Sequence, residues 1–142
     1  MAAFERDISD AAKSIVVISP YMQAGRVNTL LPALQSAISR SVTISICTRA
    51  ARTYNEKLRN AVVESISQLQ QMGVAVRMYE ELQQHCAIID KSVVWYGNVD
   101  FLAFGRKDSD VLRFENVDIA GELSAIYDGM DCEQLFISDV DM

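Results

Sequence analysis

The chain has 142 residues, of which 50% are hydrophobic and 23% are charged, as expected of one globular domain. No apolar run approaches the roughly 18–20 residues of a membrane span, and the N-terminus lacks the basic and apolar regions of a secretory signal. The formal net charge of −6 argues against a strongly basic nucleic-acid-binding protein. We therefore expect a single soluble domain over residues 1–142 that makes no membrane contact.

The charge is unevenly distributed along the chain. Residues 128–142 carry five acidic side chains and no Lys or Arg, which leaves the rest with a net charge of −1. Within that rest, residues 26–63 carry six Lys and Arg side chains against Glu56 alone, a net charge of +5. We therefore expect an acidic C-terminal tail from about residue 128, and the acidic total does not exclude a local basic surface.

The three cysteines, Cys47, Cys86 and Cys132, are far apart in the sequence, and two of them lie inside apolar runs. An odd number of widely spaced cysteines is typical of reduced thiols and not of a disulfide or zinc framework. The pattern predicts a cytoplasmic protein with no metal site, and no cofactor is expected.

Helices and strands are predicted to alternate through the first half of the chain. Apolar periodicity and apolar runs indicate helix, strand, helix, strand, helix and strand in turn, at 3–13, 15–18, 26–40, 42–47, 55–72 and 74–79. Pro32 is tolerated only in a first turn, so the second helix is expected to start near Asn28 or Thr29. Strands separated by helices imply right-handed crossovers and a largely parallel sheet.

The second half begins with a predicted β-hairpin, in which runs at 86–89 and 93–96 are joined by the turn Asp90-Lys91-Ser92. A further strand over 111–114 and a helix over 117–127 follow, with Asn116 as the helix cap. The residues of this helix expected to face inward are Ile119, Leu123 and Ile126. An apolar patch at 135–137 is expected to pack onto the body. The fold class is therefore α/β, a mixed, largely parallel sheet flanked by helices in an α/β/α sandwich.

The stretch from residue 83 to residue 101 resembles the signature of the phospholipase D superfamily. That signature is His-x-Lys, four residues, Asp, then a glycine-rich turn and an Asn. Alignment on Asp90 puts Gln83 at the His position, His85 at the Lys position and Asp100 near the Asn position. Residues 94–106 resemble the WYGSxNFLxFG form of a branch often attached to helicases and other DNA-metabolism proteins. The Ser-Pro-Tyr sequence after the first strand also resembles this family, in which these side chains lie near the site.

The resemblance implies an active site in which a His attacks a phosphodiester while Lys and Asn stabilise the transition state. Two such motifs face each other, so a chain with one motif is expected to form a homodimer. Gln83 has no nucleophilic ring nitrogen, His85 replaces the permanent positive charge of the Lys, and Asp100 replaces a donor with an anion. We therefore predict a catalytically inactive domain, an accessory interaction module of a nucleic-acid-processing system.

Two alternatives stay open. His85 is itself the nucleophile of an active phosphodiesterase or nuclease if the register is shifted, since two residues along a strand restore the same face. Alternatively, a basic region after the 42–47 strand binds nucleic acid without catalysis, because ligands bind at the carboxyl ends of strands and arginines suit phosphate. Its candidate residues are Arg49, Arg52, Lys57 and Arg59. DNA or a DNA-processing protein is the expected partner.

Several of these residues also have simpler interpretations. His85 is then a strand-end residue with a local hydrogen bond, and Asp90 is a residue of the hairpin turn. Trp95 is expected in the core.

Overall fold

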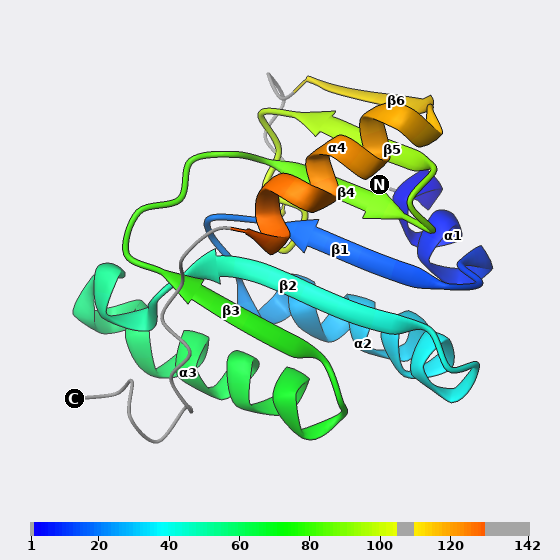
Figure 1. Ribbon diagram of the computed structural model, residues 1–142. Coiled ribbons are helices and arrows are strands. Elements are labelled where there is room, and N and C mark those ends of the chain that lie inside the picture. The colour runs from blue at the N-terminus through cyan, green and yellow to red at the C-terminus, as the bar shows by residue number, and fades with distance from the viewer. Residues whose placement is uncertain (1, 105–109, 130–142) are drawn as a thin grey trace.

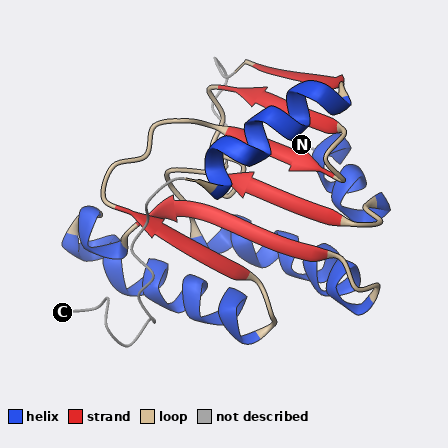
Figure 2. Ribbon diagram, viewed as in Figure 1, coloured by secondary structure: helices blue, strands red, loops and turns tan. Residues whose placement is uncertain are grey.

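The computed structural model describes residues 2–104 and 110–129, which form a six-stranded sheet with helices on both faces (Figures 1 and 2). The strands are β1 (Ser14–Ile18), β2 (Thr43–Arg49), β3 (Ala75–Tyr79), β4 (Cys86–Ile89), β5 (Val93–Gly97) and β6 (Val111–Glu115). The helices are α1 (Ala2–Asp10), α2 (Ala24–Ser39), α3 (Glu56–Gln71) and α4 (Val117–Asp128), with a 3-10 turn η1 (Ala51–Thr53) before α3.

The strand order across the sheet is β3-β2-β1-β4-β5-β6. β1, β2 and β3 are parallel, whereas β4, β5 and β6 each run antiparallel to the strand before them in this order. The predicted mixed α/β sheet flanked by helices is confirmed. The parallel arrangement is limited to β1–β3, which crossover helices connect. β4 follows β3 through a loop and pairs with β1, and β4, β5 and β6 then pair consecutively and antiparallel.

The core consists of two layers on opposite faces of the sheet. The helices α1, α2 and α3 cover one face, where the largest buried side chains include Phe4, Leu34 and Ile66. On the other face α4 crosses the sheet (Figure 1). Its Tyr127 packs in a cluster with Ile18 of β1 and with buried residues of β2, β4 and β5. Successive strand residues point to opposite faces, so each strand contributes to both layers.

The predicted start of α2 is wrong. The helix begins at Ala24, so Pro32 lies in its interior and not in its first turn. Proline there cannot donate a hydrogen bond to the carbonyl of Asn28, at a cost of about 3 kcal/mol. Because Val27 and Leu30 are buried on the same helix face as later apolar residues, packing of this face offsets the cost.

The predicted inner face of α4 is also wrong. Ala120 and Tyr127 are buried, whereas Ile126 is 59% exposed and Ile119 is exposed as well. Leu123 alone of the three predicted residues packs against the cluster, and it is only partly buried. The helix is turned by about 100°, one residue step, from the expected orientation. The small Ala120 allows close approach to the sheet, and the large Tyr127 fills the space at the other end.

Other predictions about these elements hold. The remaining element boundaries agree within about three residues, and the predicted cap is confirmed, since Asn116 Oδ1 accepts the N–H of Ile119 at 2.9 Å. Trp95, Cys47 and Cys86 are buried. Cys132, the 135–137 patch and nearly all of the acidic tail lie outside the described residues. Among the helices of the described ranges, none is long and apolar enough to cross a membrane.

Candidate functional site

The candidate residues converge at one edge of the sheet. The parallel strands β1 and β2 end there, and β4 begins there because it runs antiparallel to β1. Tyr21 follows β1, Arg49 ends β2, His85 precedes β4 and Asp100 follows β5. Two candidate sites that are separate in the sequence, the signature stretch and the basic region, therefore share this edge through Arg49.

His85 and Asp100, two of the three positions at which the alignment with the signature differs, face each other. His85 Nε2 lies 3.4 Å from Asp100 Oδ1, and both side chains are half-buried. The same Oδ1 accepts the backbone N–H of Tyr21 at 3.2 Å, which ties the carboxylate to the end of β1. The arrangement places a carboxylate where the signature has a neutral amide donor, directly beside the imidazole.

Arg49 connects this pair to the loop between β3 and β4. Its Nε donates to the carbonyl oxygen of Leu82 at 3.0 Å, and its Nη1 donates to the Tyr21 hydroxyl at 2.9 Å. The guanidinium carbon lies 4.9 Å from the centre of the Tyr21 ring, within range of a cation–π contact. Arg49 thus fixes the Tyr21 ring next to Asp100.

Buried polar contacts hold the loop after β1 in place. The Tyr54 hydroxyl accepts the backbone N–H of Met22 at 2.9 Å, and burial raises the pKa of Tyr54 to about 12. Ser19 Oγ donates to the carbonyl of Tyr21 at 2.7 Å and accepts the N–H of Leu102 at 3.3 Å. The loop after β1 and the turn after β5 are therefore joined. As expected, the Ser-Pro-Tyr segment lies at this edge.

Asp90 lies at the far end of β4 from His85. It is a turn residue with φ of 55°, and its carboxylate accepts the backbone N–H groups of Ala12, Lys13 and Ser14 at 2.7–3.1 Å. Burial acts to raise the pKa of Asp90, but these three hydrogen bonds outweigh it and the pKa lies below its usual value. The contacts of Asp90 support the hairpin-turn interpretation.

The remaining predicted residues are spread over the neighbouring surface. Gln83 is exposed in the loop before β4. Arg52 Nη2 pairs with Glu80 at 3.4 Å, Arg59 Nη2 donates to the carbonyl of Tyr54 at 3.2 Å, and Lys57 is exposed on α3. The basic region is thus partly neutralised or occupied by contacts within the chain.

A cavity of about 450 Å³ opens beside Asp100. The loop after β1, η1, the start of α3 and the turn after β5 form its walls, with Tyr21, Tyr54 and Phe104 as its aromatic residues. Sequence reasoning did not find this cavity, because Tyr54 and Phe104 belong to no catalytic pattern and are brought together only by the fold.

The family model described as "Cardiolipin synthase, PLD-like domain" matches residues 4–130. The chain belongs to the PLD-like domain family. A comparison with curated protein sequences gives no significant match.

Solved structures share the fold of this PLD-like domain. NucT from Helicobacter pylori is 18% identical with a TM-score of 0.72, and the match covers 94% of this chain and 89% of that one. Nuc from Salmonella typhimurium, a phospholipase D family member, is 17% identical with a TM-score of 0.70, over 89% of this chain and 83% of that one. TrmBL2, an archaeal chromatin protein with a novel mode of DNA binding, is 10% identical with a TM-score of 0.61, over 89% of this chain and 46% of that one.

The residues at this edge of the PLD-like domain carry an amide, a positive charge and a negative charge. Gln83 offers an amide at the position where the family signature has its nucleophile. Arg49 supplies a positive charge at this edge, where it contacts the Tyr21 ring, and Asp100 supplies a negative charge at the same edge, where it contacts His85. The described residues contain no group of three side chains suited to hold a metal ion.

Proposed function

We propose that this PLD-like domain is catalytically inactive and serves as a homodimeric interaction module that is accessory to nucleic-acid processing. The observation that carries the proposal is the negative charge of Asp100 at the edge where a phosphodiester would approach, with an amide, Gln83, in the nucleophile position. The module would use the PLD-like frame as a scaffold, with its phosphodiester chemistry lost.

Electrostatics argues against phosphodiester attack at this edge. A carboxylate at position 100 meets the non-bridging oxygens of any phosphodiester that approaches His85. Two like unit charges 4 Å apart repel by about 4 kcal/mol near a protein surface, which corresponds to roughly a thousandfold in rate. The loss of the nucleophile at position 83 removes the covalent route in addition.

The accessory role rests on the sequence and on one relative. Residues 94–106 resemble the branch of the family that is attached to helicases and other DNA-metabolism proteins. TrmBL2, which shares the fold, is a DNA-binding chromatin protein. The chain carries one signature where the family site needs two, which supports a homodimer.

The direct test is a cleavage assay without metal ions on single-stranded DNA, duplex DNA and an aryl phosphodiester. We expect no hydrolysis above background by the unaltered chain. A triple variant with Gln83→His, His85→Lys and Asp100→Asn serves as the matched comparison, because it restores the family signature in the same frame. Hydrolysis by the unaltered chain that disappears in His85→Ala would contradict the proposal.

An active phosphodiesterase that uses His85 is the second candidate, and the His85–Asp100 contact favours it as well. A carboxylate beside one ring nitrogen orients an imidazole and leaves the other nitrogen for attack. Asp100→Asn separates the two candidates. If Asp100 orients a nucleophilic His85, this substitution should reduce the rate of hydrolysis. If the domain is inactive, neither the unaltered chain nor the variant should hydrolyse the substrate.

A further inference from the structure

The cavity beside Asp100 gathers exposed apolar side chains on the described surface. Tyr21 is 43% exposed, Leu58 is 53% exposed and Phe104 is 58% exposed, and all three line it. Its volume of about 450 Å³ lies within the range of small-molecule sites. Apolar side chains grouped around a cavity of this size indicate a surface that binds something.

The polar groups of the cavity are suited to hydrogen bonding and not to holding a phosphate. Among the described residues that line the cavity, Asp100 carries the charge, and Gln23 and Asn55 lie on the walls. Gln23 Oε1 accepts the N–H of Phe104 at 2.9 Å, and Asn55 Oδ1 accepts the N–H of Leu58 at 3.2 Å. Both amides use their oxygens in these bonds, so their nitrogens are the groups that remain as donors to a ligand.

We propose that this cavity binds one unpaired nucleobase of a single-stranded nucleic acid. The inference rests on the nucleic-acid part of the proposed function and names the ligand of the site. A base has a flat face for Tyr21 and Phe104 to stack on, and cytosine carries an exocyclic amino group that donates to a carboxylate such as Asp100. An Asn at position 100 would donate a hydrogen bond to a phosphate. The Asp at this position would instead accept a hydrogen bond from the amino group of a base.

The surrounding charges favour a neutral ring over a charged ligand. A phosphate inside the cavity would meet the Asp100 carboxylate. A cationic side chain from a partner protein would meet Arg49, whose guanidinium lies 4.9 Å from the centre of the Tyr21 ring. A neutral base with both donors and acceptors avoids both repulsions, and Arg49 stays at the rim to meet a backbone phosphate.

The test measures the affinity of the full chain for labelled decamers of deoxycytidine and of thymidine by fluorescence anisotropy. The two pyrimidines have similar rings, but thymine lacks the exocyclic amino group. We expect the cytidine decamer to bind at least about fivefold more tightly, and Asp100→Asn to remove the preference. Tyr21→Ala and Phe104→Ala should each weaken cytidine binding by about fivefold or more.

Tyr96→Ala is the matched control, because Tyr96 is an exposed aromatic residue that lines a different cavity. It should leave the affinity unchanged. Circular dichroism of each variant checks folding, and the comparison of two decamers on the unaltered chain needs no variant.

Equal affinity for the two decamers, no binding of either, or affinity that depends on Lys57 and Arg59 but not on Tyr21 and Phe104 would overturn the inference. Incubation of the same samples reports on the proposed function separately. Cleavage of the decamers would contradict the inactive domain whatever the base preference, whereas intact decamers without a preference would contradict only the base-binding cavity.

Discussion

Asp90 lies in the hairpin turn, and its contacts are structural. Its carboxylate joins the hairpin turn to the connection between α1 and β1, across 76–78 residues of sequence. The turn chemistry of Asp90-Lys91-Ser92 therefore placed this residue correctly in the hairpin turn, whereas its three backbone partners follow no sequence rule. Such partners become visible only when the sheet has brought the two loops together.

We predict that Asp90→Asn destabilises the domain by about 1–2 kcal/mol, because a neutral amide oxygen replaces three charge-assisted hydrogen bonds. Asn tolerates the positive φ at this position, so backbone strain does not contribute. Lys91→Asn is the matched control, since Lys91 also has a positive φ of 52° in the same turn. Urea denaturation of both variants measures the difference, and an equal loss in both would contradict the role of the carboxylate.

The stability of the domain should also depend on pH through Asp90. Because its folded pKa is lowered, its contribution is present above the unfolded pKa of about 4 and is lost as pH falls through the folded value. The free energy of unfolding should therefore decrease below about pH 4. In Asp90→Asn this decrease should be smaller, and parallel pH profiles for the two proteins would show that Asp90 makes no such contribution.

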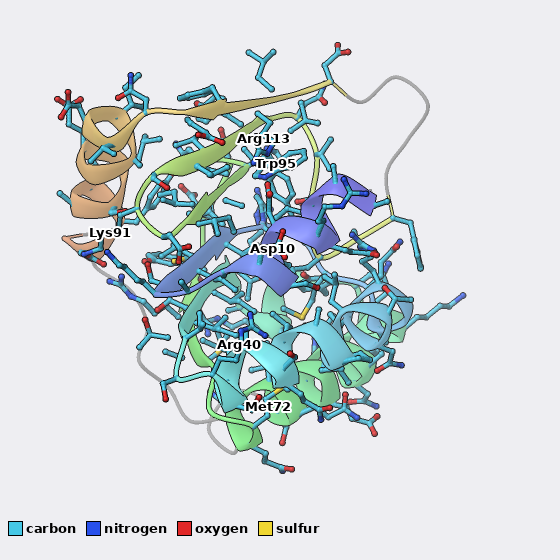
Figure 3. All side chains as sticks on the ribbon, turned by 90° about the vertical axis from the view of Figure 1, so that its right-hand side faces the viewer. Asp10, Arg40, Met72, Lys91, Trp95 and Arg113 are labelled. Carbon is cyan, nitrogen blue, oxygen red and sulfur yellow. The ribbon has the colours of Figure 1, made fainter. Side chains whose placement is uncertain are left out.

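At the scale of elements, α1 is fixed to the antiparallel half of the sheet by Asp7. Its carboxylate accepts hydrogen bonds from Trp95 Nε1–H at 2.7 Å and from Arg113 Nε–H at 2.8 Å. Trp95 and Arg113 are cross-strand neighbours on β5 and β6. Both side chains lie beside α1 (Figure 3). The Trp95 ring also meets Phe4 edge to face at 5.7 Å.

We predict that Asp7→Ala destabilises the domain by about 2 kcal/mol, because it leaves the Trp95 N–H and the Arg113 guanidinium without their shared acceptor. Asp10→Ala on the same helix is the control. Asp10 is exposed near the helix C-terminus, where a negative charge is unfavourable, so its removal should be neutral or slightly stabilising. Thermal unfolding of both variants distinguishes them, and similar melting temperatures would refute the prediction.

The helix α4 shows where prediction of elements from sequence fails. Its existence, its bounds and its Asn116 cap follow from local chemistry, and the structure confirms them. The orientation of the helix does not follow from local chemistry, because Ile119 and Ile126 are more hydrophobic than Ala120 and yet are exposed. The shape of the sheet surface decides which face packs, and this shape depends on residues far away in the sequence.

For the whole molecule, the sheet brings together at one edge residues that occur in separate stretches of the sequence. His85 and Asp100 were identified from the family signature and Arg49 from its charge, and the order of β2, β1 and β4 makes them neighbours. The cavity beside them could not be predicted, because Tyr54 and Phe104 become significant only through the loops that they line.

We predict that the full chain is a homodimer in solution, since a single signature provides half of the family's site. Sedimentation velocity at two concentrations should give a mass near twice 15.8 kDa. A monomer at both concentrations would contradict the dimer and would leave the base-binding cavity unaffected, because the residues that line it come from one chain.

The central position of β1 also determines how long this strand waits for its pairing partners during synthesis. β1 precedes β2 and β4 in the sequence, but it lies between them in the sheet, and it pairs with residues 86–89 only after β2, β3 and the helices between them have been synthesised. Until then one side of an apolar strand has unpaired backbone groups, which can template association with other chains. Nascent chains that stall before the hairpin should therefore be the form of this protein that most needs chaperones.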